Sequence, residues 1–270
     1  MCCLSAEKIT RITIDADSLR SEIRDKGVRV LDVRKEEDFK QNHIPSAVNL
    51  PLATLLSDDS PQKVLQLTQS FGIDDETPVV VYDDTFGALA SRVAWTLQYI
   101  GHQNVSLLGI TYGTWKKMGL ETSAEQSSFA KKNHSLKIRP EILATIDYLE
   151  SVKGKNGTIL IDNRERLNYL ENHIPGAINL PYRMLASPEN ILRPKEELRR
   201  LVQNRNIPLG VETITYCGSV GTLSGLAYYA LKSAGMENVK LYVRSFKEWK
   251  ALQKPVDGQK DAHYWDLSAE

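Results

Sequence analysis

The sequence predicts an α/β protein in which one fold occurs twice, each copy a parallel sheet flanked by helices. First, LDVRKEEDFKQNHIPSAVNLP, which begins at Leu31, recurs as LIDNRERLNYLENHIPGAINLP, which begins at Leu160. Second, Trp115 recurs as Trp249 after the related segments GHQNV and GMENV. Third, short β-rich runs alternate with helical patterns in both halves, which is typical of parallel strands joined by helical crossovers.

The elements expected in the two copies follow the same order along the chain. In the first copy we expect strands at 28–33, 47–50, 78–82 and 105–108, and helices at 16–26, 86–100 and 112–118. In the second we expect strands at 158–162, 177–180, 213–216 and 239–242, and helices at 141–153, 195–204 and 223–234.

The division into domains rests on a change in composition between the copies. Residues 121–137 read ETSAEQSSFAKKNHSLK, a polar, Ser-rich stretch without a strong apolar period, as is typical of a linker. We therefore predict a first domain over 8–121, a linker over 122–137, a second domain over 138–255 and a tail over 256–270.

Composition excludes several classes of function. The chain has 270 residues, with 34 Lys and Arg against 34 Asp and Glu, so a nucleic-acid partner is not expected. No long apolar run and no targeting pattern is found, so we expect a cytoplasmic protein without membrane contact. The chain has only three cysteines, Cys2, Cys3 and Cys217, so a disulfide scaffold is not expected. No cluster has metal-ligand spacing, so we expect neither a metal nor a cofactor.

The candidate site lies around Cys217, in the segment ETITYCGSVGTLSGLAYYALKSAG. The offset of 134 residues between the copies (217 − 83) places Asp83 opposite this cysteine. Cys217 follows a strand, at the edge where parallel sheets bind ligands. The small residues Gly218, Ser219 and Gly221 let the backbone curl with its N–H groups pointing inward, and a helix follows. Such a nest stabilises an anion and lowers the pKa of a cysteine placed in it.

The cysteine has two other interpretations. Cys217 can be a small buried residue that only packs at the end of a strand. Phosphatases with a catalytic cysteine need an arginine six positions later, and Leu223 stands there. Sulfur transfer needs no such guanidinium, so the loop favours that chemistry.

The paired D-x-R…HIPxAxNLP blocks, the six-residue loop CGSVGT and the closing segment SFKEW resemble the tandem rhodanese sulfurtransferases over nearly the whole chain. The resemblance implies two rhodanese-like domains, of which the first lacks the nucleophile, and an active site near their interface. It also implies that Cys217 takes sulfur from 3-mercaptopyruvate or thiosulfate as a persulfide. Thiol acceptors such as thioredoxin or glutathione, or cyanide, would then receive the sulfur.

The resemblance leaves the donor open. Members that use thiosulfate commonly carry basic residues after the cysteine, and this loop has none. CGSVGT is similar to the CGSGVT loop of the 3-mercaptopyruvate sulfurtransferases, with Val220 and Gly221 exchanged in order. Those enzymes have an insertion after the D-S-R motif that supplies a second arginine. Here only ERLNYLEN separates Arg164 from His173, so the insertion is absent. The second arginine is therefore missing, unless Arg166 or Arg183 takes its place.

Each candidate side chain has a structural alternative. Arg164 would hold the anionic part of the donor, or it is tied to a neighbouring carboxylate, as Arg34 in the other copy suggests. Asp162 is expected to accept hydrogen bonds from loop N–H groups. His43, which the resemblance places near the active-site serine, equally suits a structural role, because His173 occupies the same turn in the other copy.

The loop residues Gly218, Val220, Gly221 and Thr222 are expected to bind the persulfide through their backbone. The hydroxyls of Ser219 and Thr222 can donate to the sulfur, and the resemblance gives Ser219 a part in proton transfer. In the structural alternative, these hydroxyls only form hydrogen bonds within the loop, and Thr222 caps the helix. A rival hypothesis is a non-catalytic binding or redox-sensing module.

Overall fold

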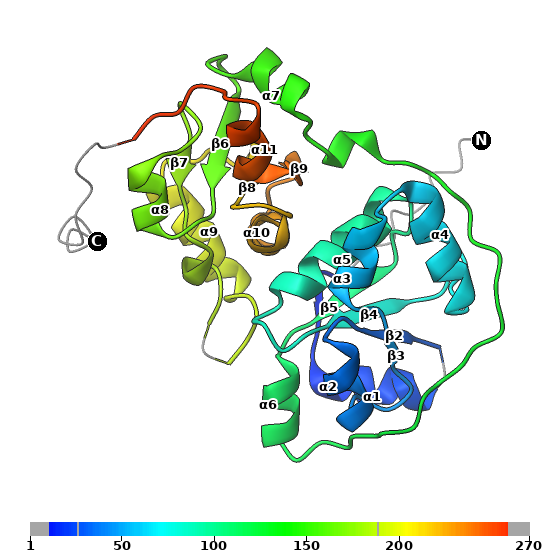
Figure 1. Ribbon diagram of the computed structural model, residues 1–270. Helices are drawn as coiled ribbons and strands as arrows, with labels where there is room; N and C mark the ends of the chain where they lie inside the picture. Colours follow the sequence, from blue (N-terminus) through cyan, green and yellow to red (C-terminus); the bar gives the residue numbers. More distant parts are fainter. Residues whose placement is uncertain (1–10, 26, 188, 259–270) are drawn as a thin grey trace, which may run out of the picture.

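The computed structural model describes residues 11–25, 27–187 and 189–258, which form two α/β domains packed against each other (Figure 1). Cys2, Cys3 and nearly all of the tail lie outside the described residues. In the described part of the chain, no helix is both long and apolar enough to cross a membrane.

Domain 1 contains a parallel sheet with the strand order β1-β5-β4-β2-β3. The strands are β1 (Thr13–Ile14), β2 (Arg29–Asp32), β3 (Val48–Asn49), β4 (Val79–Tyr82) and β5 (Val105–Leu108). The helices are α1 (Ala16–Arg24), α2 (Glu36–Gln41), α3 (Leu52–Ser57), α4 (Pro61–Ser70), α5 (Ala88–Tyr99) and α6 (Tyr112–Lys117). Strands β2, β4 and β5 are buried at every position, because helices cover both faces of the sheet.

Domain 2 repeats this arrangement with the strand order β7-β6-β8-β9, again parallel. The strands are β6 (Thr158–Asp162), β7 (Ile178–Asn179), β8 (Glu212–Tyr216) and β9 (Val239–Leu241). The helices are α7 (Ile146–Val152), α8 (Arg166–Glu171), α9 (Lys195–Asn204), α10 (Thr222–Ser233) and α11 (Ser245–Ala251), with 3-10 turns η1 (Pro140–Ile142) and η2 (Tyr182–Met184).

The two sheets confirm the predicted duplication and fold class. Asp32 pairs with Tyr82 across β2 and β4, and Asp162 pairs with Tyr216 across β6 and β8. The residues that end these strands therefore reach the same edge of each sheet, and the Asp83 and Cys217 positions follow directly after it.

The expected helix over 141–153 is wrong in its first half. Leu143 forms a parallel bridge with Leu241, and Ala144 N donates to Leu241 O at 3.0 Å. This segment thus extends the open edge of the second sheet beside β9. A new helix, α7, then starts behind Thr145, whose side chain accepts from Tyr148 N. Pairing with an exposed edge explains the break, because it satisfies backbone groups that a helix would otherwise bond internally.

The domains meet along α5 and α10, whose backbones come close together (Figure 1). A Cβ added at Gly225 of α10 would lie 3.3 Å from the backbone nitrogen of Arg92 on α5. The glycine therefore permits a near approach that a larger side chain would resist. This contact brings α5 of domain 1 to the start of the helix that follows Cys217.

The segment that joins the domains runs along domain 1 (Figure 1). Its backbone bonds to domain 1 from Lys132 N to Gln69 O at 3.1 Å and from Lys137 N to Ile100 O at 2.9 Å. Its His134 is buried against His102, with ring centroids 5.0 Å apart. Nδ1 of His134 lies 2.8 Å from Thr68 Oγ1.

This histidine pair is expected to make the fold sensitive to acid. Burial lowers the pKa of His102 to about 4, and it also lowers the pKa of His134, although Asp74 and Asp75 nearby act in the opposite direction. An unfolded histidine titrates near about 6.5, so below that pH the unfolded chain binds more protons than the folded one. Stability is therefore fully present above about pH 6.5 and falls toward pH 4, by up to about 1.4 kcal/mol per pH unit for each proton.

Urea unfolding between those pH values checks this expectation. His102→Phe keeps a ring beside His134 but removes one titrating group, so its free energy of unfolding should fall less steeply with acid than that of the wild type. Equal slopes for the two proteins would contradict the assignment.

Candidate active site around Cys217

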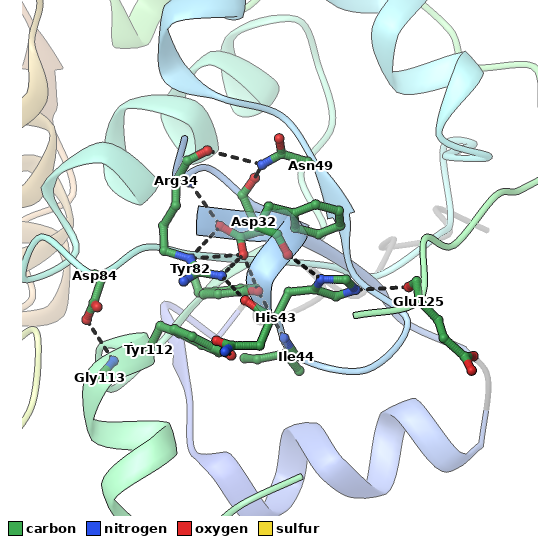
Figure 2. Close-up of polar contacts among 12 residues, drawn as sticks. Asp32, Arg34, His43, Ile44, Asn49, Tyr82, Asp84, Tyr112, Gly113 and Glu125 are labelled. Atoms are coloured by element: carbon green, nitrogen blue, oxygen red, sulfur yellow. Dashed lines mark hydrogen bonds and ion pairs between the residues drawn. The ribbon is translucent and has the colours of Figure 1, made fainter. Parts of the chain in front are cut away.

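A buried carboxylate, Asp32, ends strand β2 of domain 1 and is bonded to an arginine two residues later (Figure 2). Arg34 donates from Nε and Nη2 to the Asp32 carboxylate, with an Nη2–Oδ2 distance of 2.6 Å. Tyr82 also donates its hydroxyl to Asp32 Oδ2, and the same hydroxyl accepts from Ile44 N at 3.1 Å. Burial and the charge of Asp32 raise the pKa of Tyr82 well above its usual range, so the phenol remains a donor.

Domain 2 contains the same arrangement. Arg164 donates from Nη2 to Asp162 Oδ2 at 2.6 Å and to Asn172 O at 2.6 Å. Its guanidinium carbon also lies 4.0 Å from the centre of the Phe246 ring. Tyr216 accepts from Ile174 N at 3.1 Å, and burial raises its pKa far above the ordinary value. Arg164 is thus tied to a neighbouring carboxylate, as expected for a structural arginine. Its Nη1 forms no hydrogen bond with a described residue.

His43 is held within domain 1. Its Nδ1 lies 2.8 Å from Phe39 O and its Nε2 lies 3.0 Å from Glu125 O, so each ring nitrogen faces a backbone carbonyl (Figure 2). His173 repeats the first contact, with Nδ1 2.7 Å from Tyr169 O. The contacts of His43 are those of a turn that is fixed to the joining segment, and its part in substrate binding stays a prediction.

The loop of domain 1 that corresponds to the cysteine loop surrounds a carboxylate. Asp83 Oδ1 accepts from the N–H groups of Thr85 and Gly87, and its Oδ2 accepts from Ala90, all at 2.8 Å. Burial raises the pKa of Asp83, and these backbone donors act against that rise. In this fold the loop therefore directs three backbone N–H groups at an anionic group on the side chain of its first residue.

The cysteine loop, residues 217–222, has the same relation to the following helix. Gly221 is the N-cap of α10 with φ +76°, as Gly87 is the N-cap of α5 with φ +84°. By the offset of 134 residues, the N–H groups that match the three donors are those of Ser219, Gly221 and Ser224. None of these three forms a hydrogen bond to an acceptor among the described residues. Cys217 lies beside them with 2% of its surface exposed.

Ser245 contacts the cysteine and was missed by the sequence analysis. Its Oγ accepts from Cys217 N at 3.1 Å and lies 3.7 Å from Cys217 Sγ, while it donates to Tyr242 O at 2.9 Å. The residue has φ +56°, an unfavourable value for a serine. The available signal was its place in SFKEW, because Thr111 occupies the same position in the first copy and caps α6.

Two residues of the loop carry the hydroxyl groups that the sequence predicts to donate to the sulfur. Ser219 and Thr222 are partly exposed, and neither side chain forms a hydrogen bond with a described residue. Thr222 is the first residue of α10 and not its N-cap, because Gly221 takes the left-handed conformation that ends the loop. In the same loop, Gly218 O accepts from Lys247 N at 2.9 Å.

The other arginines considered for the donor differ in exposure. Arg183 follows β7, and its side chain is 73% exposed while it pairs with Glu165. The preceding Tyr182 stacks on Phe86 of domain 1, with ring centroids 5.0 Å apart. Arg183 is therefore a cation at the junction of the domains. Arg166, at the start of α8, also has interaction partners.

The chain is similar to known proteins over most of its length. Residues 15–118 and 145–252 match the family of rhodanese-like domains. The chain is 27% identical over 265 residues to the thiosulfate sulfurtransferase of Cricetulus griseus, covering 87% of this chain and 89% of that protein. It is 27% identical over 247 residues to the 3-mercaptopyruvate sulfurtransferase of Homo sapiens, covering 84% and 82%. Its fold resembles that of SseA from Escherichia coli, with a TM-score of 0.78, 24% identity, and coverage of 88% and 99%.

The chain belongs to the rhodanese family, with one rhodanese-like domain in each half. The predicted family and fold class are thereby confirmed.

Matched substitutions can separate the two roles considered for Arg164. Arg34→Ala and Arg164→Ala each leave a buried aspartate without its partner, so each should lower the free energy of unfolding by about 3–5 kcal/mol. Only Arg164→Ala should also raise the KM for the sulfur donor, because only domain 2 has the cysteine. Urea unfolding and steady-state kinetics measure both effects. A donor KM that remains at the wild-type value would restrict Arg164 to its structural role.

Asp83 offers a second test. Asp83→Ala removes the acceptor for three loop N–H groups, and each unsatisfied buried group costs about 1–3 kcal/mol. We expect a lower thermal midpoint, with Asp83→Asn nearer to the wild type because it retains one carbonyl acceptor. A thermal midpoint for Asp83→Ala equal to that of the wild type would show that the carboxylate does not hold the loop.

Proposed function

We propose that this protein is a sulfurtransferase that carries the transferred sulfur as a persulfide on Cys217. The observation that carries the proposal is the match between the two loops. In domain 1 the N–H groups of Thr85, Gly87 and Ala90 bind a carboxylate, whereas the corresponding N–H groups in domain 2 belong to a loop and helix start that follow a cysteine. A site that binds an anion in this way stabilises both a thiolate and the terminal sulfur of a persulfide.

The proposed reaction has two steps. With thiosulfate, the Cys217 thiolate attacks the outer sulfur, the S–S bond breaks, and sulfite leaves with the bonding electron pair. With 3-mercaptopyruvate, the C–S bond breaks and the thiol proton ends on the carbon, so pyruvate leaves. In either case a Cys217 persulfide forms. Cyanide or a thiolate then attacks its outer sulfur and releases the cysteine as thiolate, which is covalent catalysis through a shared intermediate.

Ser245 and the loop backbone support the nucleophile in this proposal. Ser245 Oγ lies close to Sγ, and its hydroxyl can turn from Tyr242 O toward the sulfur when negative charge develops there. Gly218, Val220, Gly221 and Thr222 provide the loop, and Ser219 is the candidate for proton transfer to the leaving pyruvate. The acceptors proposed are thiols such as thioredoxin or glutathione, and cyanide.

Arg183 and the Nη1 of Arg164 are the cationic groups proposed to bind the donor. The loop itself contains no charged side chain, so the anionic part of the donor must be balanced from outside it. A relatively exposed guanidinium at the domain junction suits a carboxylate or a sulfonate, which it can bind in a bidentate manner.

The alternative is a binding or redox-sensing module without turnover, which the low exposure of Cys217 favours. Such a module would hold the cysteine in the same fold without forming a persulfide from either donor.

Mass measurement decides between these functions. After brief separate exposure to 3-mercaptopyruvate and to thiosulfate, we expect the intact mass to increase by one sulfur atom with at least one donor. Cyanide should remove it and yield thiocyanate, and Cys217→Ser should take up none. No gain from either donor would favour the module. A gain that persists in Cys217→Ser would place the sulfur on another residue.

A further inference from the structure

Arg92 of domain 1 reaches the cysteine loop of domain 2. It lies on α5 with 1% of its surface exposed, and its Nε donates to Val220 O at 2.9 Å. Its Cδ would lie 3.4 Å from a Cβ added at Gly221, so its aliphatic part packs against the next residue of the loop. A side chain of the domain without a cysteine thus contacts the backbone beside Cys217.

This bond fixes the direction of one loop N–H group. Val220 O and Gly221 N–H belong to one planar trans peptide, so they point in opposite directions. When Arg92 binds the carbonyl on the outer side of the loop, the N–H of Gly221 is turned to the inner side. The corresponding group in domain 1, Gly87 N–H, donates to Asp83 Oδ1 at 2.8 Å. Gly221 N–H therefore occupies the place from which this fold binds an anion.

The guanidinium is itself held in position. Its Nη2 donates to Asp59 Oδ2 at 2.9 Å, and its Nη1 donates to Thr96 Oγ1. Burial lowers the pKa of Arg92 to about 10, against the opposing effects of Asp59 and, more weakly, Cys217, so the group remains charged at neutral pH. Asp59 also lies 3.8 Å from Arg244, the residue before Ser245. One carboxylate thereby connects the two segments beside the cysteine.

Domain 2 has no arginine at the equivalent position to contact the Asp83 loop of domain 1. The residue of α10 that matches Arg92 is Leu226 (226 − 92 = 134), which is buried in the apolar core. The carbonyl that matches Val220 O belongs to Phe86, which has φ +45°. In that loop Asp83 binds the N–H groups directly, so no outside group is needed to orient them. The arginine is thus present where the loop contains no carboxylate.

We propose that Arg92 is a positioning residue that holds the Val220–Gly221 peptide so that Gly221 N–H faces the thiolate or persulfide of Cys217. The inference deepens the proposed function and rests on it, since it assigns the domain without a cysteine a direct part in forming the sulfur site.

The test measures the reactivity of Cys217 without a sulfur donor. In a background in which Cys2 and Cys3 are replaced by Ser, the rate of alkylation by iodoacetamide is followed against pH. Arg92→Leu, which introduces the residue of the matching position, should raise the pH of half-maximal alkylation by about one unit. The kcat for sulfur transfer should fall by about tenfold or more, with donor KM changed less than about threefold. Arg92→Lys retains the charge and should recover part of the alkylation shift.

Two further variants make the result specific. Arg29→Leu removes another buried arginine of domain 1, which contacts Phe129 and Gly72 and forms none of the contacts with the cysteine loop. It should lose stability and keep the wild-type alkylation profile. Asp59→Asn removes the charge that pairs with Arg92. The side chain of Asp59 is 27% exposed and lines a cavity of about 720 Å³ between the domains. This variant should shift the profile in the same direction, by less.

A folded Arg92→Leu protein with the wild-type alkylation profile and kcat would overturn the proposal. If that variant does not fold, Asp59→Asn decides: a shifted profile supports the role of Arg92, and an unchanged profile overturns it. Failure of the wild type to accept sulfur would contradict the proposed function, whereas the alkylation profiles would still report whether Arg92 acts on Cys217.

Discussion

A buried aspartate bonded to an arginine at the end of an interior strand is the contact on which each domain depends. The ion pair between this aspartate and arginine fixes the chain where it leaves the sheet. A tyrosine hydroxyl of the neighbouring strand accepts from the isoleucine N–H of the His-Ile-Pro turn in each domain, and this connects the turn to the same site. A buried carboxylate without its partner is costly, so both charges must be kept together. The same constraint commits most of the Arg164 guanidinium to structure and limits what it can offer a substrate.

The two domains differ in what their equivalent loops enclose. Asp83 fills the first loop with its own carboxylate, and this stabilises that domain without leaving a site for another anion. Cys217 supplies a single sulfur atom in the second loop, so the backbone N–H groups can meet charge that forms during a reaction. The orientation of that loop then depends on groups outside it, namely Ser245, which accepts from Cys217 N, and Arg92 across the domain contact.

The sequence predicted the duplicated parallel sheets because repeated motifs and strand patterns are local. It also identified the loop at Cys217, since a strand, small residues and a helix follow one another directly. The sequence did not predict features that depend on contacts between segments far apart in the chain. The expected helix over 141–153 is interrupted because Leu143 pairs with Leu241. Ser245 reaches the sulfur only because β8 and β9 lie side by side.

By itself, the sequence determined the fold class, the family and the difference between Asp83 and Cys217, because each depends on residue types at fixed spacing. Tertiary structure decided which side chains surround the cysteine. Arg92 is 125 residues from Cys217 (217 − 92) and belongs to the other domain, so no spacing could associate them. Their association arises from the packing of α5 against α10, which places a buried guanidinium against the carbonyl of Val220.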